Sequence, residues 1–156
     1  MGETGIGTLD VVVPASVDVP LITARVYSDA GGGGTFGFTE EPVDTTCCGG
    51  ILLRGSLSRI VAPTDPRRFR FNVGVRALFE APTITFRVLG PGGTILREVT
   101  RSYPASTVLQ ETAEALFGAP LAANALVEVE VTSGNAIVYG ATVDNVTNDP
   151  SIQYVR

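Results

Sequence analysis

Polar and apolar residues alternate along several stretches between Phe69 and Val143, and this pattern restricts the possible folds more than any other feature of the chain. Residues 69–77, 84–88 and 127–132 follow it most closely, and no segment in the run has a strong helical period. Neighbouring side chains of a β-strand point to opposite faces, so a period of two indicates strands with one buried face and one solvated face. The chain is therefore predicted to be all-β, with antiparallel sheets packed as a sandwich.

Turn residues divide the chain into short extended segments. These segments recur at spacings of about 8–12 residues, which is typical of a Greek-key β-sandwich, and we expect about seven to nine antiparallel strands. The expected strands are drawn from these extended segments: 8–13, 21–27, 35–39, 51–54, 57–61, 69–78, 83–89, 94–103, 107–112, 126–132 and 136–143.

Two short connections are predicted to be hairpin turns. Gly90–Gly93 should join 83–89 to 94–103, and Ser133–Asn135 should join 126–132 to 136–143. Glu111–Phe117 is the only segment predicted to form a helical turn, because Thr112 can cap its start and Gly118 can end it.

Length and composition favour one domain that covers residues 1–156. A chain of 156 residues, 44% of them hydrophobic, can bury one core. Residues 21–156 are predicted to form the core sandwich, and residues 1–20 an N-terminal strand with a linker. The predicted first strand, Thr8–Val13, is apolar on both faces and is followed by Pro14. We therefore expect this strand to dock on a partner or to be exchanged with another copy.

Missing residue types exclude several classes of function. The chain has no His, no Lys and no Trp, and all eleven basic residues are Arg. Without His, neither a Ser-His-Asp nor a Cys-His catalytic arrangement can form, and without Lys a Schiff base and a Walker phosphate loop are excluded. The net charge of −5 argues against nucleic acid as a partner. No apolar stretch approaches the roughly 20 residues that membrane insertion needs.

The only two cysteines, Cys47 and Cys48, are adjacent. Neighbouring cysteines pair with each other only through a strained ring, because an ordinary disulfide needs favourable Cβ directions. Three readings stay open: two reduced thiols in or beside a loop, a vicinal disulfide, or an intermolecular link. A metal site would need further soft ligands, which the chain lacks.

Oxygen-bearing side chains gather after the last predicted strand, in the segment 144–149. Asp144, Asn145 and Asp149 form a candidate calcium site, because calcium takes about six to eight oxygen ligands. In the alternative reading, these side chains accept backbone N–H bonds in an Asx turn that ends the strand. No other cofactor is expected.

Glu128 and Glu130 are a second candidate for chemistry, because glycosidases work with two carboxylates. Catalytic carboxylates need a pocket that shifts the pKa of one of them, and a solvated strand face does not provide it. We therefore expect both residues on a wet face, where Arg87 and other arginines of neighbouring strands can pair with them.

Three motifs follow one another in the chain: Gly34–Gly37, Phe69–Val75 and Tyr139–Pro150. Through these motifs, residues 21–152 resemble the immunoglobulin-like β-sandwich modules found in large secreted and cell-surface proteins of bacteria. The resemblance implies an immunoglobulin-like fold, an extracellular or cell-surface location, and an architectural or binding role without a reaction. The first residues carry no signal peptide, so we expect a mature fragment of an exported protein.

These observations favour a non-enzymatic module that serves in adhesion, assembly or spacing. Its partner would be another protein or further copies of itself, bound through strand edges. The alternative is a ligand-binding module for calcium or a glycan that uses the 144–149 loop. A hydrolase built on carboxylates is a third hypothesis.

Overall fold

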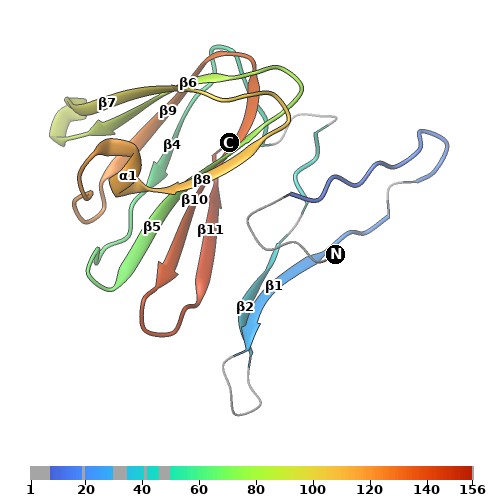
Figure 1. Ribbon diagram of the computed structural model, residues 1–156, viewed down its shortest axis with the longest axis horizontal. Helices are drawn as coiled ribbons and strands as arrows, with labels where there is room; N and C mark the ends of the chain where they lie inside the picture. Colours follow the sequence, from blue (N-terminus) through green and yellow to red (C-terminus); the bar gives the residue numbers. More distant parts are fainter. Residues whose placement is uncertain (1–7, 19, 30–34, 41, 46–49, 156) are drawn as a thin grey trace.

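The computed structural model describes residues 8–18, 20–29, 35–40, 42–45 and 50–155. Within these ranges the chain forms two antiparallel sheets packed face to face, and a separate two-stranded ribbon (Figure 1). The prediction of an all-β sandwich is therefore confirmed. Neither of the short helices in these ranges has the length that crossing a membrane requires.

The first sheet has the strand order β11-β10-β5-β8, and the short strand β3 pairs with the start of β10. Its strands are β3 (Leu52–Leu53), β5 (Phe69–Ala77), β8 (Val108–Thr112), β10 (Asn135–Asp144) and β11 (Pro150–Tyr154).

The second sheet has the strand order β4-β9-β6-β7. Its strands are β4 (Leu57–Val61), β6 (Thr83–Leu89), β7 (Ile95–Ser102) and β9 (Leu126–Ser133). Strands β4 and β11 thus each end the strand order of their own sheet.

The core lies between the two sheets and is made by every second residue of the central strands. On β6 and β9 the inward side chains are those of Ile84, Phe86, Val127, Val129 and Val131, and all are fully buried. On β5 and β10 the buried side chains include those of Val73, Val75, Ala136 and Val138. Burying one such aliphatic or aromatic side chain stabilises the fold by about 1.5–3 kcal/mol. The alternation predicted for 69–77, 84–88 and 127–132 is confirmed.

One predicted hairpin is confirmed and the other is wrong. Strand β6 pairs with β7 through a turn that contains the short 3₁₀ helix η1 (Pro91–Gly93). Strands β9 and β10 do not pair: β9 lies between β4 and β6, whereas β10 lies in the other sheet. Gly134 crosses from one sheet to the other with φ of 66°, and a Cβ atom there would lie 2.5 Å from the carbonyl oxygen of Ala81. Both strands carry a continuous apolar face, and these faces are buried by packing across the sandwich.

The predicted helical turn is confirmed as α1 (Ala113–Phe117). The hydroxyl of Thr112 accepts a hydrogen bond from the N–H of Ala115 at 3.0 Å, and Gly118 ends the helix with φ of 73°. Leu116, 2% exposed, anchors the helix in the core.

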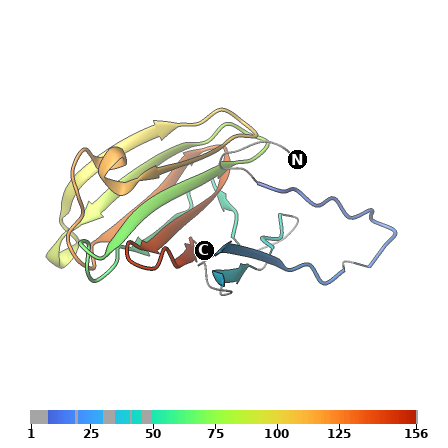
Figure 2. The ribbon, with the colours of Figure 1, turned by 60° about the horizontal axis from the view of Figure 1, so that its bottom comes forward.

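The N-terminal region differs from the prediction. Residues 8–18 form no strand within the described chain, so pairing of Thr8–Val13 with a partner or with another copy stays a prediction. Three valines in succession give no alternation for a one-sided sheet, and Pro14 cannot donate to a ladder. Farther along, β1 (Ala24–Asp29) and β2 (Thr35–Glu40) pair as a ribbon that lies beside β11 (Figures 1 and 2).

The prediction also missed β11. This strand pairs with β10 from Tyr139↔Tyr154 to Val143↔Pro150. Pro150 is its first residue, one of the few strand positions where a proline is tolerated. The last segment predicted to be extended ends at 143.

Gly74 on β5 provides a test of this packing. It lies opposite Tyr139, and a Cβ atom at Gly74 would lie 2.0 Å from Cζ of the tyrosine ring. We expect Gly74→Ala to lower the free energy of unfolding in urea by about 1–3 kcal/mol, because the ring must move. In the Tyr139→Ala background the same substitution should cost much less. An equal loss in both backgrounds would contradict the steric explanation.

Candidate functional site

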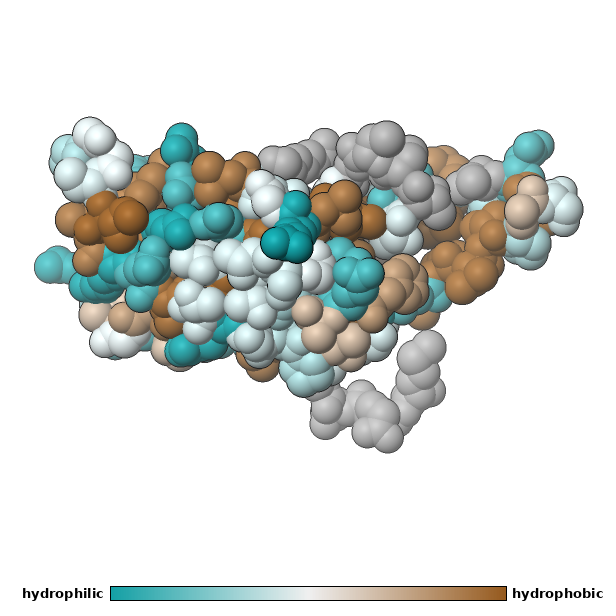
Figure 3. All heavy atoms as spheres, turned by 90° about the horizontal axis from the view of Figure 1, so that it is seen from above, coloured by the Kyte–Doolittle hydropathy of each residue, from teal (hydrophilic) through white to brown (hydrophobic). Residues whose placement is uncertain are grey.

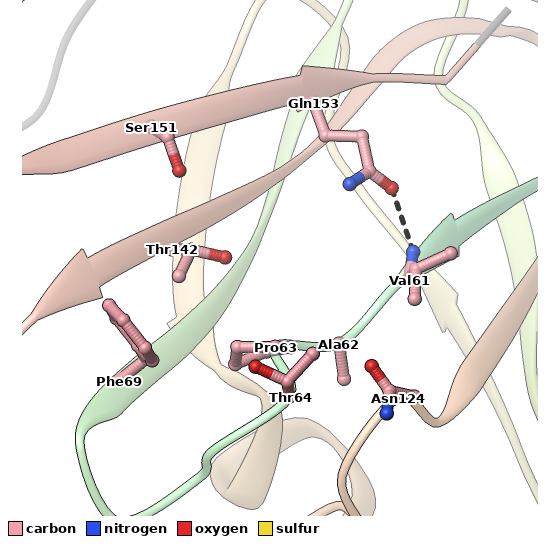
Figure 4. Close-up of a pocket in the computed structure, with 9 residues that line it drawn as sticks. All are labelled: Val61, Ala62, Pro63, Thr64, Phe69, Asn124, Thr142, Ser151 and Gln153. Carbon is pink, nitrogen blue, oxygen red and sulfur yellow. Dashed lines mark hydrogen bonds between the residues drawn. The ribbon is translucent and has the colours of Figure 1, made fainter.

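A shallow depression opens at the side of the sandwich where the edge strands β4 and β11 face each other. Its volume is about 390 Å³, and it is open to solvent (Figure 4). Its lining comes from β4 and the segment after it, the start of β5, the loop before β9, and strands β10 and β11. The lining residues are Val61, Ala62, Pro63, Thr64, Phe69, Asn124, Thr142, Ser151 and Gln153.

The register of β10 and β11 explains why the core stops here. Thr142 pairs with Ser151, and Gly140 pairs with Gln153. Directly opposed residues of antiparallel strands share a face, and these four share the inward face with Val138. Elsewhere on β10 that face is apolar, but here the two strands present the hydroxyls of Thr142 and Ser151 and the carboxamide of Gln153. The sheets therefore leave a polar space between their edges instead of a closed core.

Gln153 connects the two edges across this space. Its Oε1 atom accepts a hydrogen bond from the backbone N–H of Val61 at 2.7 Å (Figure 4). The hydrogen bonds of β4 to β9 use the alternate residues, so the N–H of Val61 points away from its own sheet. The side chain of Gln153 thus satisfies an edge donor that another strand would otherwise use.

The predicted calcium residues lie next to the depression: Asp144 ends β10, and Asn145 and Asp149 belong to the loop between β10 and β11. Asp144 is 6% exposed, and both of its carboxylate oxygens are engaged. Oδ1 accepts hydrogen bonds from the N–H of Val146 at 2.8 Å and of Thr147 at 3.4 Å, which is an Asx turn. Oδ2 accepts two hydrogen bonds from the guanidinium of Arg68, at 2.8 and 3.0 Å.

A second guanidinium occupies the other side of this loop. Nη1 of Arg70 donates to Oδ1 of Asn145 at 3.1 Å and to Oδ1 of Asn148 at 3.4 Å. Asp149 is exposed, and its N–H donates to the hydroxyl of Thr147. A calcium ion stays a prediction here, and binding it would require displacement of Arg68 from Asp144. In the part of the chain that the structure describes, no three acidic, Cys or His side chains gather as a metal site.

The carboxylates of Glu128 and Glu130 lie on a sheet face and not in a cleft. Arg87 Nη1 lies 2.6 Å from Glu130 Oε2 and 3.6 Å from Glu128 Oε1, and Arg87 Nε donates to Glu98 at 2.6 Å. Glu128 also pairs with Arg59 of β4 at 3.0 Å. These hydrogen bonds to Glu98 and Glu130 raise the pKa of Arg87. The cross-strand charge pairs expected for this face are present, although the two glutamates are ion-paired and only partly solvated.

The outer face of the first sheet carries a second cluster of contacts. The Tyr139 ring lies 6.1 Å from the Tyr154 ring, and its hydroxyl donates to Gln110 at 3.1 Å. The Tyr154 hydroxyl donates to the carboxylate of Glu40 on β2. Burial raises the pKa of Tyr154, and the hydrogen bond to Glu40 raises it further. This contact attaches the β1–β2 ribbon to the sandwich.

The two cysteines, Cys47 and Cys48, lie outside the described residues, so the three readings of their state stay predictions. In comparisons with known proteins, no family model, no curated protein and no solved structure matches the chain.

The depression was missed by the sequence reasoning because five separate segments contribute to it. Its one local signal is the change from Val138 to Thr142 on the inward face of β10, followed by Ser151 and Gln153 at inward positions of β11. That signal becomes readable only once β11 is recognised as a strand.

The loop geometry predicts a specific dependence of stability on pH. The N–H of Val146 and the guanidinium of Arg68 lower the pKa of Asp144 below its ordinary value of 3.8. The unfolded chain therefore binds the proton more readily than the folded one. The stabilisation is present above the unfolded pKa and is lost as the pH falls through the folded pKa.

We expect Asp144→Asn to lower the melting temperature at neutral pH, and to weaken the loss of stability that the unmodified chain shows below about pH 5. Melting temperatures measured from neutral to acidic pH check this. Asp18→Asn, at an exposed carboxylate, serves as the control and should leave the curve unchanged. An Asp144→Asn curve parallel to that of the unmodified chain would contradict the role of this carboxylate.

Proposed function

We propose that this chain is a non-enzymatic interaction module of an exported bacterial protein, with an immunoglobulin-like sandwich as its scaffold. Its role is adhesion, assembly or spacing, and it binds a protein partner or further copies of itself. The observation that carries the proposal is the N-terminal arm, which we define as residues 8–17.

The arm exposes apolar side chains that no strand of the described chain covers. The exposed fractions are 80% for Leu9, 54% for Val11, 89% for Val12 and 56% for Val17. In Figures 1 and 2 the segment leads away from the sandwich, and hydrophobic side chains appear at the projecting end in Figure 3. A cluster of exposed apolar side chains on an extended segment favours a protein partner.

Among the described residues, one ion pair joins the arm to the sandwich. Nη2 of Arg76, on the outer face of β5, lies 2.7 Å from Oδ2 of Asp10. The Arg76 side chain is 14% exposed, whereas that of Asp10 is 69% exposed. Nε of Arg76 is buried and has no acceptor among the described residues. A single partly exposed pair is a weak attachment, so the arm can leave its own sandwich at a small cost.

The arrangement of charges also supports a binding role over a hydrolytic one. Glu128, Glu130 and Asp144 each pair with an arginine, so their negative charges are neutralised on the molecule itself. Acid–base work needs two carboxylates held in different environments around a substrate. The pairs with Arg59, Arg68 and Arg87 instead stabilise the strands that carry them.

The test compares the self-association of the full chain with that of a variant that lacks residues 1–13. Light scattering coupled to size-exclusion chromatography, with a reducing agent to remove any disulfide link, should give oligomers for the full chain and monomers for the variant. The double substitution Val11→Asp, Val12→Asp should weaken association by about tenfold or more, because the proposed interface would lose two valine side chains that association buries.

Val146→Asp is the matched control, because Val146 is a similarly exposed valine (80%) in the loop after β10. It should leave the oligomers unchanged. An oligomeric state that does not respond to removal of residues 1–13, or that responds equally to Val146→Asp, would refute the role of the arm.

A further inference from the structure

The depression between β4 and β11 presents more hydrogen-bonding groups than the protein itself uses. Five of its nine lining residues carry a hydroxyl or a carboxamide: Thr64, Asn124, Thr142, Ser151 and Gln153. Of these five side chains, only that of Gln153 makes a hydrogen bond to a described residue, and it uses only the oxygen of its carboxamide. In Figure 4 the hydroxyl of Thr142, the oxygen of Asn124 and the amide nitrogen of Gln153 point toward the same space.

These groups both donate and accept hydrogen bonds. A hydroxyl offers one donor and two lone pairs, and a carboxamide offers two donors and one acceptor oxygen. The natural counterpart is a ligand whose own groups donate and accept at close spacing, which is the chemistry of sugar hydroxyls. A carboxylate or phosphate only accepts, and would leave half of this capacity unused.

The lining carries no charge. Arg68, which precedes β5, and Asp144, which ends β10, neutralise each other at 2.8 Å. The guanidinium of Arg68 also lies over the ring of Phe69, 5.1 Å from its centroid. None of the nine lining residues is ionisable, so the site favours a neutral ligand over an acidic one.

The remaining lining is apolar and suits the C–H faces of a sugar ring. Phe69 contributes an aromatic ring that is half-buried, and Val61, Ala62 and Pro63 contribute aliphatic surface beside it. Pockets for small ligands combine such surface with a few convergent polar groups, at volumes of about 300–1,000 Å³. A volume of about 390 Å³ that is open to solvent accommodates one or a few units of a longer chain.

A docked β-strand fits the depression less well. Strand addition needs free N–H and C=O groups along an edge, and the N–H of Val61 is already bonded to Gln153. Strand β11 begins with Pro150, which has no N–H to offer. The side chains that line the depression remain available, whereas these backbone positions do not.

From these observations we propose that the depression binds a neutral carbohydrate, with Thr142, Ser151 and Gln153 as hydrogen-bonding residues and Phe69 as the apolar platform. The site is separate from the N-terminal arm. It therefore does not depend on self-association, and each proposal can fail without the other.

The test uses the ¹⁵N-labelled full chain, titrated with neutral oligosaccharides of glucose, mannose, galactose and N-acetylglucosamine, and with the parent monosaccharides. Oligogalacturonate and a heparin oligosaccharide serve as acidic probes. At least one neutral sugar should shift the backbone amides of Phe69, Thr142, Ser151 and Gln153 in a saturable way. The dissociation constant should be on the order of 0.1–1 mM, as befits a shallow site.

Variants assign the binding to the depression. Thr142→Val and Ser151→Ala should each weaken binding about fivefold, as expected for the loss of one hydrogen bond. Thr23→Val and Ser16→Ala remove hydroxyls of the same types from exposed positions elsewhere and should change nothing. Melting temperatures establish that each variant is folded. The variant that lacks residues 1–13 should bind the sugar as the full chain does.

Three results would overturn the proposal. The first is that no neutral sugar of the panel shifts these amides. The second is that the shifts occur but do not respond to Thr142→Val or Ser151→Ala. The third is that the acidic probes, or a peptide with the sequence of residues 8–17, shift these amides while the neutral sugars do not, which would assign the depression to an anionic ligand or to strand docking.

Discussion

The contact between the two sheets is the interaction on which the rest of the structure depends. It is made by alternate residues of β5, β6, β9 and β10, and the fully buried side chains of Phe86, Val129 and Val138 lie at its centre. A shift of one residue in any of these strands would turn its apolar face to solvent, so the register is strongly fixed. The edge strands, the loops and the N-terminal arm lie outside this central contact.

The same alternation determines where polar chemistry is found. The outward residues of the second sheet form a row of ion pairs around Arg87, and every cation in the described pairs is an arginine. The planar guanidinium can hold two carboxylates at once, as Arg87 does with Glu98 and Glu130. Polar groups that face inward without such a partner occur where the sheets separate, at the edges formed by β4 and β11. The carbohydrate site that we propose therefore lies at an edge of this sandwich and not on a face.

Sequence reasoning was most successful where a strand has one buried face. Residues 57–61 and 83–89 were predicted with their observed bounds, and the caps of α1 were read correctly from Thr112 and Gly118. It was less successful with pairing, because a turn signal such as Ser133–Asn135 does not tell whether the next strand stays in the same sheet. That choice depends on the apolar faces of β9 and β10, which are buried against the opposite sheet.

The candidate site was harder to predict for a related reason. The Asx turn, which was the alternative reading of Asp144, is present, whereas the calcium site stays a prediction. Arg68, the partner of Asp144, is 76 residues earlier in the chain, so local reasoning could not supply it. The depression needs five segments and the unpredicted strand β11. Polar residues at inward positions, such as Thr142 and Ser151, can be recognised as lining a site only when the register of the strands is known.

The hydrogen bond between Gln153 and Val61 has a consequence for synthesis of the chain. The ribosome synthesises β4 before the residues that pair with it. Glu128 of β9 follows its partner Arg59 by 69 residues. Gln153, which accepts the hydrogen bond from Val61, follows that residue by 92. At the usual elongation rate of about 5–20 residues per second, the nascent chain exposes an apolar, half-finished sheet for several seconds. A chain that ends before Gln153 would leave the N–H of Val61 without the acceptor that the side chain of Gln153 provides.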